Sequence, residues 1–393
     1  MPRISVIIPT YNRAHLVGEA ISSVLCQTYP DFELIVVDDG STDNTSEIVE
    51  SFKDARLRYF RQPNRGAAVA RNTAIQASRG EFVACLDSDD LFLPEKLALQ
   101  MGIVAEQPEV GLVYGLALST TGRRAIKKSS YAIPPQLTLR RLLLGPAFTW
   151  STVLIGREWL DRVGGFDEKF YLGQDWELTL RLALAGCPMA CVAQPVSIAR
   201  EQLESNTRKL PQNEAGMMAI LDKTFSDPRM PAELLIMRNL CYATQLIRIA
   251  ASAYVNSQPE LGQNYLQRAL MAEPGLIEEH ADELVNLLVY RIRGLSLDDP
   301  KDTLRQVTQF LPGDKVFSSK LRRRLWGRFY EVAAFQSYQL DESAQCIEYV
   351  IRAISKTPSS LRNRGLISIF VRSLVGNRIS NQFKRLLSIP QKS

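Results

Sequence analysis

The sequence Glu81-Phe-Val-Ala-Cys-Leu-Asp-Ser-Asp-Asp90, which continues through Leu-Phe-Leu to Pro94, joins a short apolar run to a cluster of carboxylates. The apolar half follows Gly80 and predicts a buried strand. A helical pattern follows over 95–106, opened by the proline. Carboxylates at the carboxyl end of a central strand lie where open α/β sheets bind ligands, and Mg²⁺ and Mn²⁺ prefer such oxygen donors. The stretch predicts either a metal-linked ligand site or a solvated acidic turn that caps the next helix.

Strand and helix patterns alternate on both sides of this stretch. Apolar, β-branched runs predict strands at 4–8, 32–37, 57–60, 81–86 and 111–115, with helical patterns between them. The connections are only a few residues long. We therefore expect an α/β fold with a mostly parallel sheet flanked by helices.

Polar residues cluster after three of these strands, at 9–13, 38–41 and 87–90. Because parallel strand ends share one rim of a sheet, the clusters should converge on one cleft. There Tyr11 offers an aromatic face for a base, Asp39 an acceptor for a nucleobase N–H, and Arg71 a partner for phosphate. Each residue also has a plain structural interpretation, as packing, as a turn or as a surface charge. Neither GxGxxG nor GxxxxGK[ST] is present, which disfavours a dinucleotide fold and a P-loop.

Composition limits the remaining possibilities. The 393 residues are 46% hydrophobic and 23% charged, enough for two or three globular domains. Six cysteines without a CxxC pair and only two histidines do not suggest a zinc site, and the thiols are expected to be reduced. A strand begins within a few residues of Met1, and no apolar run approaches 18 residues. We expect a cytoplasmic protein, or a peripheral one on the inner face of the plasma membrane.

Several ordered motifs carry a family resemblance. The chain resembles the family 2 glycosyltransferases in Val6-Ile-Ile-Pro-Thr-Tyr-Asn-Arg13, Val36-Val-Asp-Asp-Gly-Ser-Thr-Asp43, Gly66-Ala-Ala-Val-Ala-Arg-Asn72, Leu86-Asp-Ser-Asp-Asp90, Gly164-Gly-Phe-Asp167 and Gln174-Asp-Trp-Glu-Leu-Thr-Leu-Arg181. The match covers roughly residues 1–205. It implies a GT-A fold that transfers a sugar from a nucleotide-sugar, most often a UDP-sugar, with inversion.

The resemblance also implies roles for individual residues. Tyr11 and Asp39 match the residues that hold the base, and Pro9 belongs to the first of these motifs. Asp87 and Asp89 match the motif that holds the ribose and a divalent metal, Mn²⁺ or Mg²⁺. Arg71 is expected in the same nucleotide-sugar site.

Asp175 is the expected catalytic base. It follows Gly173 and begins a helix, so the positive end of the helix dipole should lower its pKa and keep it ionised. The alternative from the residues alone is a helix-capping aspartate; the resemblance favours the base. Trp176 is either a wall of the acceptor site or a packing residue.

The chain departs from the family pattern at two positions, one beside the expected base and one near the expected diphosphate. The usual Glu-Asp pair reads Gln174-Asp175 here. Gln202 stands where many members carry a histidine that reaches the metal or the diphosphate, which makes metal dependence less certain than the motif suggests. Arg200 is retained and is the expected partner of the diphosphate.

From residue 206 onward the pattern is helical. The segments 265–274 and 329–358 resemble tetratricopeptide helices, although two units at irregular spacing also suit an irregular bundle. Over 361–393 seven cations occur without any acidic residue, so the rest of the chain carries a slightly negative charge. This stretch is either a basic amphipathic segment that lies on a membrane or a terminal helix docked on the bundle. No nucleic-acid-binding motif accompanies it.

These patterns predict a glycosyltransferase domain at 1–205, a helical domain at 206–360 and a basic tail at 361–393. The expected partners are a nucleotide-sugar donor and a glycan or lipid-linked acceptor of envelope or exopolysaccharide synthesis. A nucleotidyltransferase is disfavoured because no phosphate-binding loop follows the first strand. A catalytically degenerate binding or scaffolding protein is disfavoured because Asp87, Asp89 and Asp175 are all present.

Overall fold

The computed structural model describes residues 1–121, 125–128, 137–200, 210–295, 308, 319–339 and 341–374. The chain divides into two compact units, Met1–Cys241 and Tyr242–Ser393. Gln202, at which the sequence departs from the family pattern, lies outside the described residues, as does the tail beyond 374.

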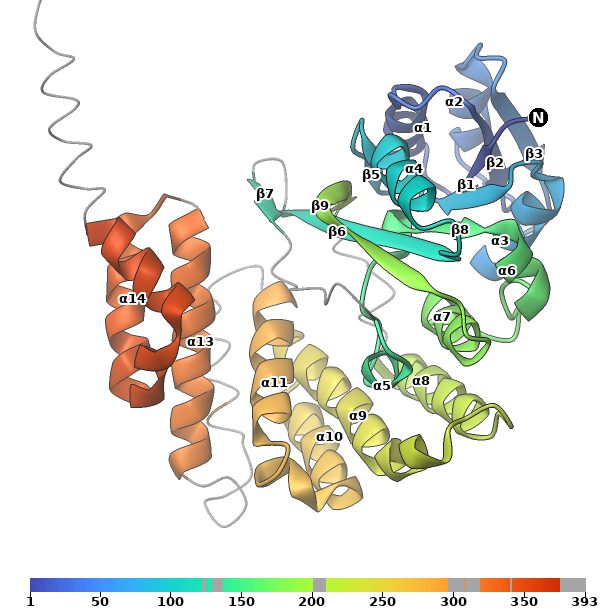
Figure 1. Ribbon diagram of the computed structural model, residues 1–393. Coiled ribbons are helices and arrows are strands. Elements are labelled where there is room, and N and C mark those ends of the chain that lie inside the picture. The colour runs from blue at the N-terminus through green and yellow to red at the C-terminus, as the bar shows by residue number, and fades with distance from the viewer. Residues whose placement is uncertain are drawn as a thin grey trace, which may run out of the picture. The chain divides into compact units, whose positions relative to one another are not determined.

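The first unit is built on one mixed sheet, which contains nine strands among the described residues (Figure 1). Parallel strands form one half of it, in the order β3 (Leu57–Arg61), β2 (Phe32–Asp38), β1 (Ile4–Thr10) and β4 (Phe82–Cys85). The other half continues with β8 (Leu154–Gly156), β6 (Leu112–Thr121), β9 (Met189–Arg200) and β5 (Leu91–Phe92), and β7 (Ala125–Lys128) pairs with β6. The sequence-based α/β prediction is confirmed.

Short-range sequence patterns did not reveal the antiparallel strand in the middle of this sheet. β8 pairs in antiparallel fashion with both β4 and β6. It is only three residues long, and its pairing partners are far away in the sequence.

Helices cover both faces of the sheet. α1 (Val17–Leu25), α2 (Thr45–Ser51) and α4 (Lys96–Glu106) pack on one face, and α3 (Ala67–Ala77), α6 (Arg157–Val163) and α7 (Gln174–Leu184) on the other. The alternation of side chains along a strand produces this arrangement. In β1, Val6 and Ile8 point into the core beneath α1, whereas Ile7, between them, packs with α3.

Asn12, in the loop after β1, does not cap the helix that follows. α1 begins at Val17, and no side chain caps it. Asn12 instead adopts a positive φ of 50°, and its side-chain oxygen accepts the backbone N–H of Thr42 at 2.8 Å. The residue therefore joins the loop after β1 to the loop after β2.

The first unit also contains α5 (Leu139–Leu143), the short helix η1 (Trp150–Thr152), α8 (Leu210–Phe225), η3 (Ala232–Met237) and the beginning of α9 (Arg238–Val255). The sequence assigned α8 to the helical region, but it lies in the same compact unit as the sheet.

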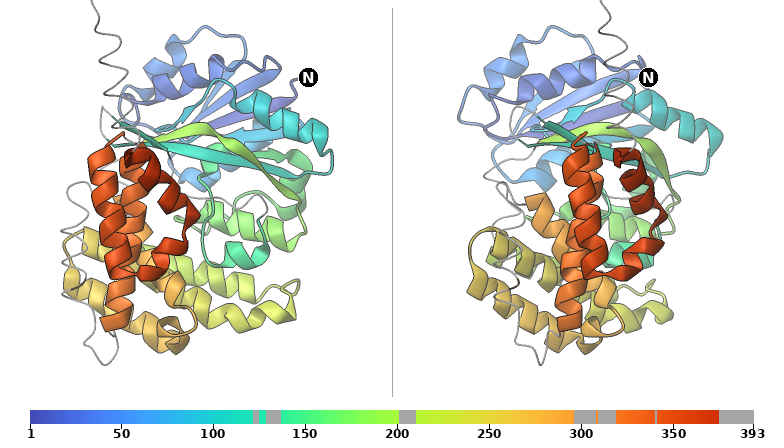
Figure 2. Two further views of the ribbon diagram at one scale, coloured as in Figure 1. Left: turned by 60° about the vertical axis from the view of Figure 1, so that its left-hand side comes forward. Right: turned by 90° about the vertical axis from the view of Figure 1, so that its left-hand side faces the viewer.

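The second unit is helical in its described part. It contains α10 (Pro259–Ala272), η4 (Pro274–Ile277), α11 (Ala281–Leu295), α13 (Ser319–Gln339), α14 (Ser343–Lys356), η5 (Pro358–Arg362) and a helix at 364–374. α13 and α14 lie side by side (Figure 2). The helical prediction is confirmed, whereas the tetratricopeptide interpretation stays a prediction. Within the described chain, no helix has both the length and the apolar character needed to cross a bilayer.

Candidate active site

The loops that follow β1 and β2 are joined by hydrogen bonds at the rim of the sheet. The backbone N–H of Asn12 donates to Ser41 Oγ at 2.9 Å, and that of Arg13 donates to Thr45 Oγ1 at 2.9 Å. Pro9 is buried in β1 opposite Val37. Tyr11 is 44% exposed on this rim. Its role in base binding remains a prediction.

Asp39 is buried and organises the loop that leads to α3. Its Oδ1 accepts from Gln62 Nε2 at 2.8 Å and from the Arg65 N–H at 3.0 Å, and its Oδ2 accepts the Gly66 N–H at 2.7 Å. A carboxylate has about four acceptor positions. Donors from the described residues occupy three of them, which leaves one acceptor position on Oδ2. Base binding by Asp39 stays a prediction.

We expect Asp39→Asn to weaken UDP binding by about 1.5–3 kcal/mol, because a charge-assisted hydrogen bond to the base is lost. The amide group would also face donors from Gln62, Arg65 and Gly66, so the melting temperature should fall. Isothermal calorimetry with UDP measures the affinity. Asp54→Asn is the matched control, since Asp54 also accepts a backbone N–H, that of Arg56 at 2.9 Å. Unchanged UDP affinity in Asp39→Asn would remove Asp39 from the site.

The acidic turn after β4 meets α3 at Arg71. Arg71 Nη2 donates to Asp87 Oδ1 at 2.6 Å, and its guanidinium lies 5.3 Å from the ring centre of Phe166. Burial alone would lower the pKa of Arg71, but the nearby Asp87 carboxylate raises it, with a further contribution from Asp175. Arg71 Nε is buried without a hydrogen-bond partner among the described residues. The guanidinium therefore bonds the acidic turn and also interacts electrostatically with Asp175.

The other two aspartates of this turn, Asp89 and Asp90, have different surroundings. Burial, followed by repulsion from Asp87, raises the pKa of Asp89, whose Oδ2 is 3.9 Å from Arg13 Nη2. Burial, followed by repulsion from Asp87 and from Asp89, raises the pKa of Asp90 to about 8. Asp90 Oδ2 accepts from Ser151 Oγ at 2.6 Å. Asp90 thus anchors the turn to η1, and Asp89 is left beside a carboxylate that repels it.

The acidic turn suits a metal that is bound together with substrate phosphates, and not a metal that is held by protein side chains alone. Among the described residues, no group of three or more His, Cys, Asp and Glu side chains could hold a metal by itself. Repulsion between Asp87 and Asp89 is what a divalent cation would relieve. One or two carboxylates combined with substrate phosphates is the usual Mg²⁺ arrangement. The residues therefore fit a metal that arrives with a diphosphate, and not a metal cage made by the protein.

Arg200 braces the acidic turn. Its backbone N–H donates to Asp90 Oδ1 at 3.1 Å, its Nε donates to the Asp89 carbonyl, and its Nη1 pairs with Glu19 of α1. The Arg200 side chain is only 15% exposed. Diphosphate binding by Arg200 stays a prediction, and it would require the guanidinium to share or exchange these partners.

Asp175 lies in the first turn of α7, after Gly173, which has a φ of 73°. The expected lowering of its pKa is wrong: burial raises it, although Arg71 and the Trp176 N–H act in the opposite direction. Loss of water around the carboxylate outweighs the helix end because the ionised form is poorly solvated there. A raised pKa makes the carboxylate a stronger base once it is ionised.

Trp176 is buried, with 2% exposure, and its Nε1 donates to the Leu142 carbonyl at 2.8 Å. This bond ties α7 to α5. Trp176 also lines a small enclosed pocket that includes Asp175, Phe148 and Trp150. Its geometry supports a packing role, and contact with an acceptor stays a prediction.

Contacts from α8 hold the N-terminal part of α7. Lys223 Nζ bonds Asp167 Oδ2 and Glu177 Oε1, both at 2.6 Å, and Glu177 also pairs with Arg181 at 2.7 Å. A Cβ at Gly173 would lie only 2.9 Å from Ile220 Cδ1 of α8. Motifs in the sequence pointed to the α7 side, but Lys223 and Ile220 lie in an ordinary helical pattern and were missed.

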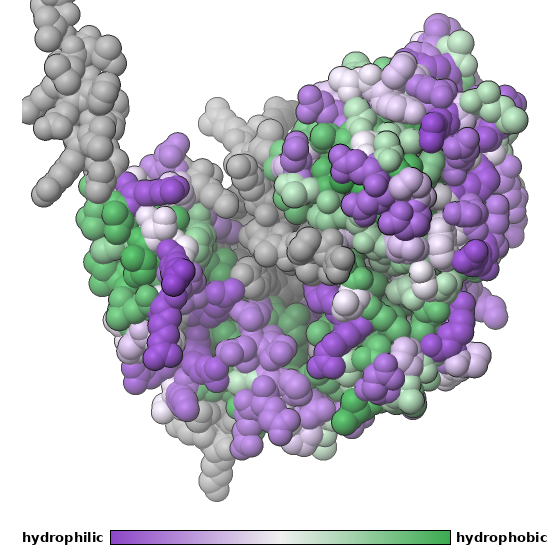
Figure 3. Space-filling model, viewed as in Figure 1, coloured by the Kyte–Doolittle hydropathy of each residue, from purple (hydrophilic) through white to green (hydrophobic). Residues whose placement is uncertain are grey.

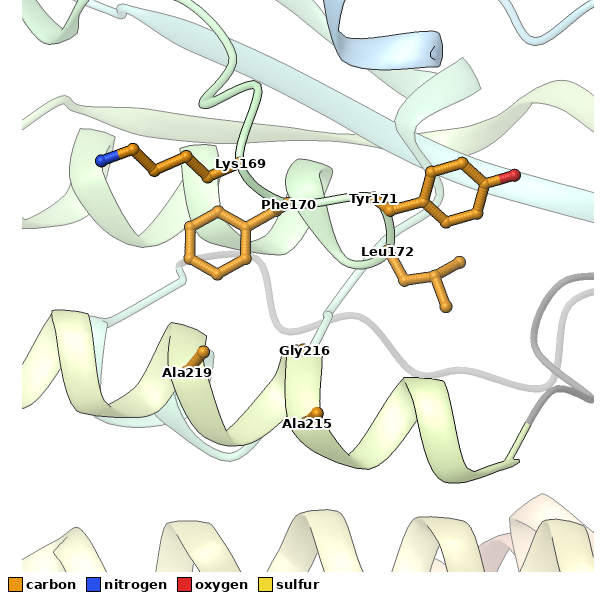
Figure 4. Close-up of a pocket in the computed structure, with 7 residues that line it drawn as sticks. All are labelled: Lys169, Phe170, Tyr171, Leu172, Ala215, Gly216 and Ala219. Carbon is orange, nitrogen blue, oxygen red and sulfur yellow. The ribbon is translucent and has the colours of Figure 1, made fainter. Parts of the chain in front are cut away.

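A pocket of about 620 Å³ opens between α8 and the loop that leads to Asp175. Figure 4 shows Phe170 and Leu172 directed toward α8 and Tyr171 directed away from it. The α8 side is lined by the small residues Ala215, Gly216 and Ala219. Sequence analysis did not anticipate this pocket, because it forms only where two distant segments meet.

Comparison with known proteins agrees with this geometry. Residues 5–164 match the family model Glycosyl transferase family 2. A beta-1,3-glucosyltransferase of Escherichia coli, named for UDP-Glc and alpha-D-GlcNAc-diphosphoundecaprenol, is 34% identical over 180 residues, which are 46% of this chain and 69% of that protein. A putative teichuronic acid biosynthesis glycosyltransferase of Bacillus subtilis is 36% identical over 160 residues, 40% of this chain and 63% of that protein.

Other relatives match a shorter region. An uncharacterized glycosyltransferase of Rickettsia felis is 49% identical over 105 residues, which are 26% of this chain. This chain covers only 17% of the length of that relative.

Solved structures share the fold. S. aureus TarS in complex with UDP superposes with a TM-score of 0.52 at 22% identity, covering 78% of this chain and 88% of that one. A Pyrobaculum calidifontis mannosyltransferase in complex with GDP-Man and Mn²⁺ superposes with a TM-score of 0.54 at 23% identity, covering 79% and 84%. These likenesses establish the GT-A fold for this chain.

Proposed function

Because the chain belongs to the family 2 glycosyltransferases, an inverting family, we propose that it transfers a sugar from a UDP-sugar to a lipid-linked glycan in envelope polysaccharide synthesis. The observation that carries the proposal is the position of Arg71. Its guanidinium bonds Asp87 of the acidic turn at 2.6 Å and also interacts electrostatically with Asp175. One cation thus joins the residues expected at the donor to the expected base.

The proposed reaction follows from this arrangement. Asp175 takes the proton of an acceptor hydroxyl while that oxygen attacks the anomeric carbon from the face opposite the diphosphate. The bond from the anomeric carbon to the diphosphate breaks, and the configuration inverts. The buried guanidinium of Arg71 stabilises negative charge that develops in the low-dielectric site. A divalent metal, when bound, would offset charge on the leaving diphosphate and would be held by Asp89 with the phosphates.

The choice of substrates rests on the relatives. The E. coli relative is named for UDP-Glc and a diphosphoundecaprenol-linked acceptor, and TarS was crystallised with UDP. The open position on Asp39 Oδ2 suits the N–H of uracil. An acceptor attached to a lipid would place the reaction at a membrane surface.

A melting-temperature panel tests the nucleotide and the metal together. We expect UDP at a concentration of 100 Kd to stabilise the protein by about 2.7 kcal/mol relative to the ligand-free protein. GDP and dTDP at the same concentration should stabilise it less. In the native protein, Mn²⁺ should raise the melting temperature of the UDP complex further. In Asp89→Asn, UDP alone should still raise the melting temperature, but Mn²⁺ should give no further increase. Asp161→Asn, an exposed aspartate of α6, is the control. Donor hydrolysis that is fully retained in chelator and in Asp89→Asn would contradict the metal. Failure of every uridine nucleotide to bind would contradict the donor.

A further inference from the structure

The last helix that the structure describes, at 364–374, has two different faces. Leu366, Ile369 and Ser373 are buried, at 0%, 7% and 2% exposure, so this side packs on the second unit. Val371 and Leu374 on the other side are 49% and 45% exposed. The part of the tail that the structure describes, at 364–374, is therefore docked on the second unit. Its outer face, however, is not simply a solvated basic surface.

Helical spacing defines what the outer face presents. At 100° per residue, Ile367, Val371 and Leu374 form one apolar strip, Arg364 lies directly beside Val371, and Arg372 lies about 100° farther round the helix on the same exposed side. All are exposed or partly exposed. Figure 3 shows hydrophobic surface gathered over this part of the molecule next to strongly hydrophilic surface. We call Ile367, Val371, Leu374, Arg364 and Arg372 the outer strip.

The positive charge around the outer strip indicates which kind of partner it binds. The sequence from Leu361 to Ser393 contains seven Lys and Arg residues and no Asp or Glu. Leu361, just before the helix, adds a side chain that is 57% exposed. Apolar side chains bordered by arginines match an anionic bilayer surface, where the apolar groups enter the headgroup boundary and the cations meet lipid phosphates. An apolar protein partner would account for Val371 and Leu374 but not for the absence of acidic residues.

We propose that the outer strip is a binding surface for anionic phospholipid membranes. Val371, Leu374 and Ile367 enter the interface, while Arg364 and Arg372 pair with phosphate groups. The proposal deepens the proposed function, since a lipid-linked acceptor lies in such a membrane, but it concerns lipid binding and requires no transfer.

The test uses the full chain and vesicles of phosphatidylglycerol and phosphatidylcholine that contain no acceptor. We expect the native protein to sediment with these vesicles and not with pure phosphatidylcholine. Val371→Glu combined with Leu374→Glu should abolish sedimentation. Arg364→Gln combined with Arg372→Gln should weaken it about 30-fold, because each cation near an anionic surface contributes roughly a factor of five.

Matched controls separate the outer strip from a general charge effect. Ile236→Glu combined with Met271→Glu changes the charge equally at side chains that are 85% and 82% exposed elsewhere, and it should bind like the native protein. Circular dichroism checks that all variants are folded. Equal sedimentation of the strip and control variants would overturn the proposal. It would also be overturned if the native protein self-associates through this face and does not sediment with the vesicles. Retained transfer to a water-soluble acceptor would show that such a failure leaves the proposed function intact.

Discussion

Asp175→Asn should lower the transfer rate on the order of 10²–10⁴-fold while leaving UDP-sugar affinity nearly unchanged. The amide keeps the shape of the side chain and can still accept the Trp176 N–H, but it cannot take the acceptor proton. Folding should therefore be retained. Steady-state transfer assays combined with calorimetry on the donor measure both quantities in the same variant.

The pH dependence of the transfer rate is an independent test of Asp175 as the catalytic base. Burial raises the pKa of Asp175 above its ordinary value of 3.8, and the base must be ionised to act. The native rate should therefore fall as the pH drops through this raised pKa, so the acid limb lies above that of an ordinary aspartate. Asp161→Asn on α6 is the control and should retain the native profile. Near-normal turnover in Asp175→Asn would refute the assignment, and a collapse of donor affinity would move Asp175 into the donor site.

Lys223→Met should lower kcat by up to about 100-fold with little change in the KM for the donor. Lys223 joins Asp167 to Glu177, which follows Asp175 by two residues in α7. Without it the helix can shift, and a displacement of about 1 Å at a reacting group can cost this much rate. Because Glu177 keeps Arg181 as a partner, the protein should still fold. Steady-state kinetics with separate kcat and KM values provide the measurement.

Two further variants distinguish positioning from general weakening of the fold. Lys223→Arg preserves the charge and should recover most of the rate. Asp222→Asn, at the position next to Lys223 in α8, breaks an exposed pair with Arg238 of α9 and should change neither constant. A parallel fall of kcat in Asp222→Asn, or an unchanged kcat in Lys223→Met, would show that α8 does not position Asp175.

Local patterns in the sequence were sufficient for the parallel strands β1 to β4 and for the rim at their carboxyl ends. β1 and β2 were predicted from β-branched runs, and both end within two residues of the expected positions. Because parallel strands end on the same side, the polar groups after them had to converge, and Arg71 does bond Asp87. The sequence also located Asp175 at the start of a helix.

What only the tertiary structure decided depends on neighbours that are distant in the sequence. The helix end at Asp175 was visible in the sequence, but the burial that raises its pKa was not, because desolvation depends on every segment packed around the carboxylate. The sequence predicts that Arg200 binds the diphosphate. In the folded chain, however, its Nη1 pairs with Glu19 and its backbone N–H donates to Asp90 Oδ1. Likewise, the sequence shows that 364–374 is basic and apolar, and only packing determines that Val371 and Leu374 face outward. Periodicity specifies which residues share a face of a helix, whereas contacts between segments specify where that face points.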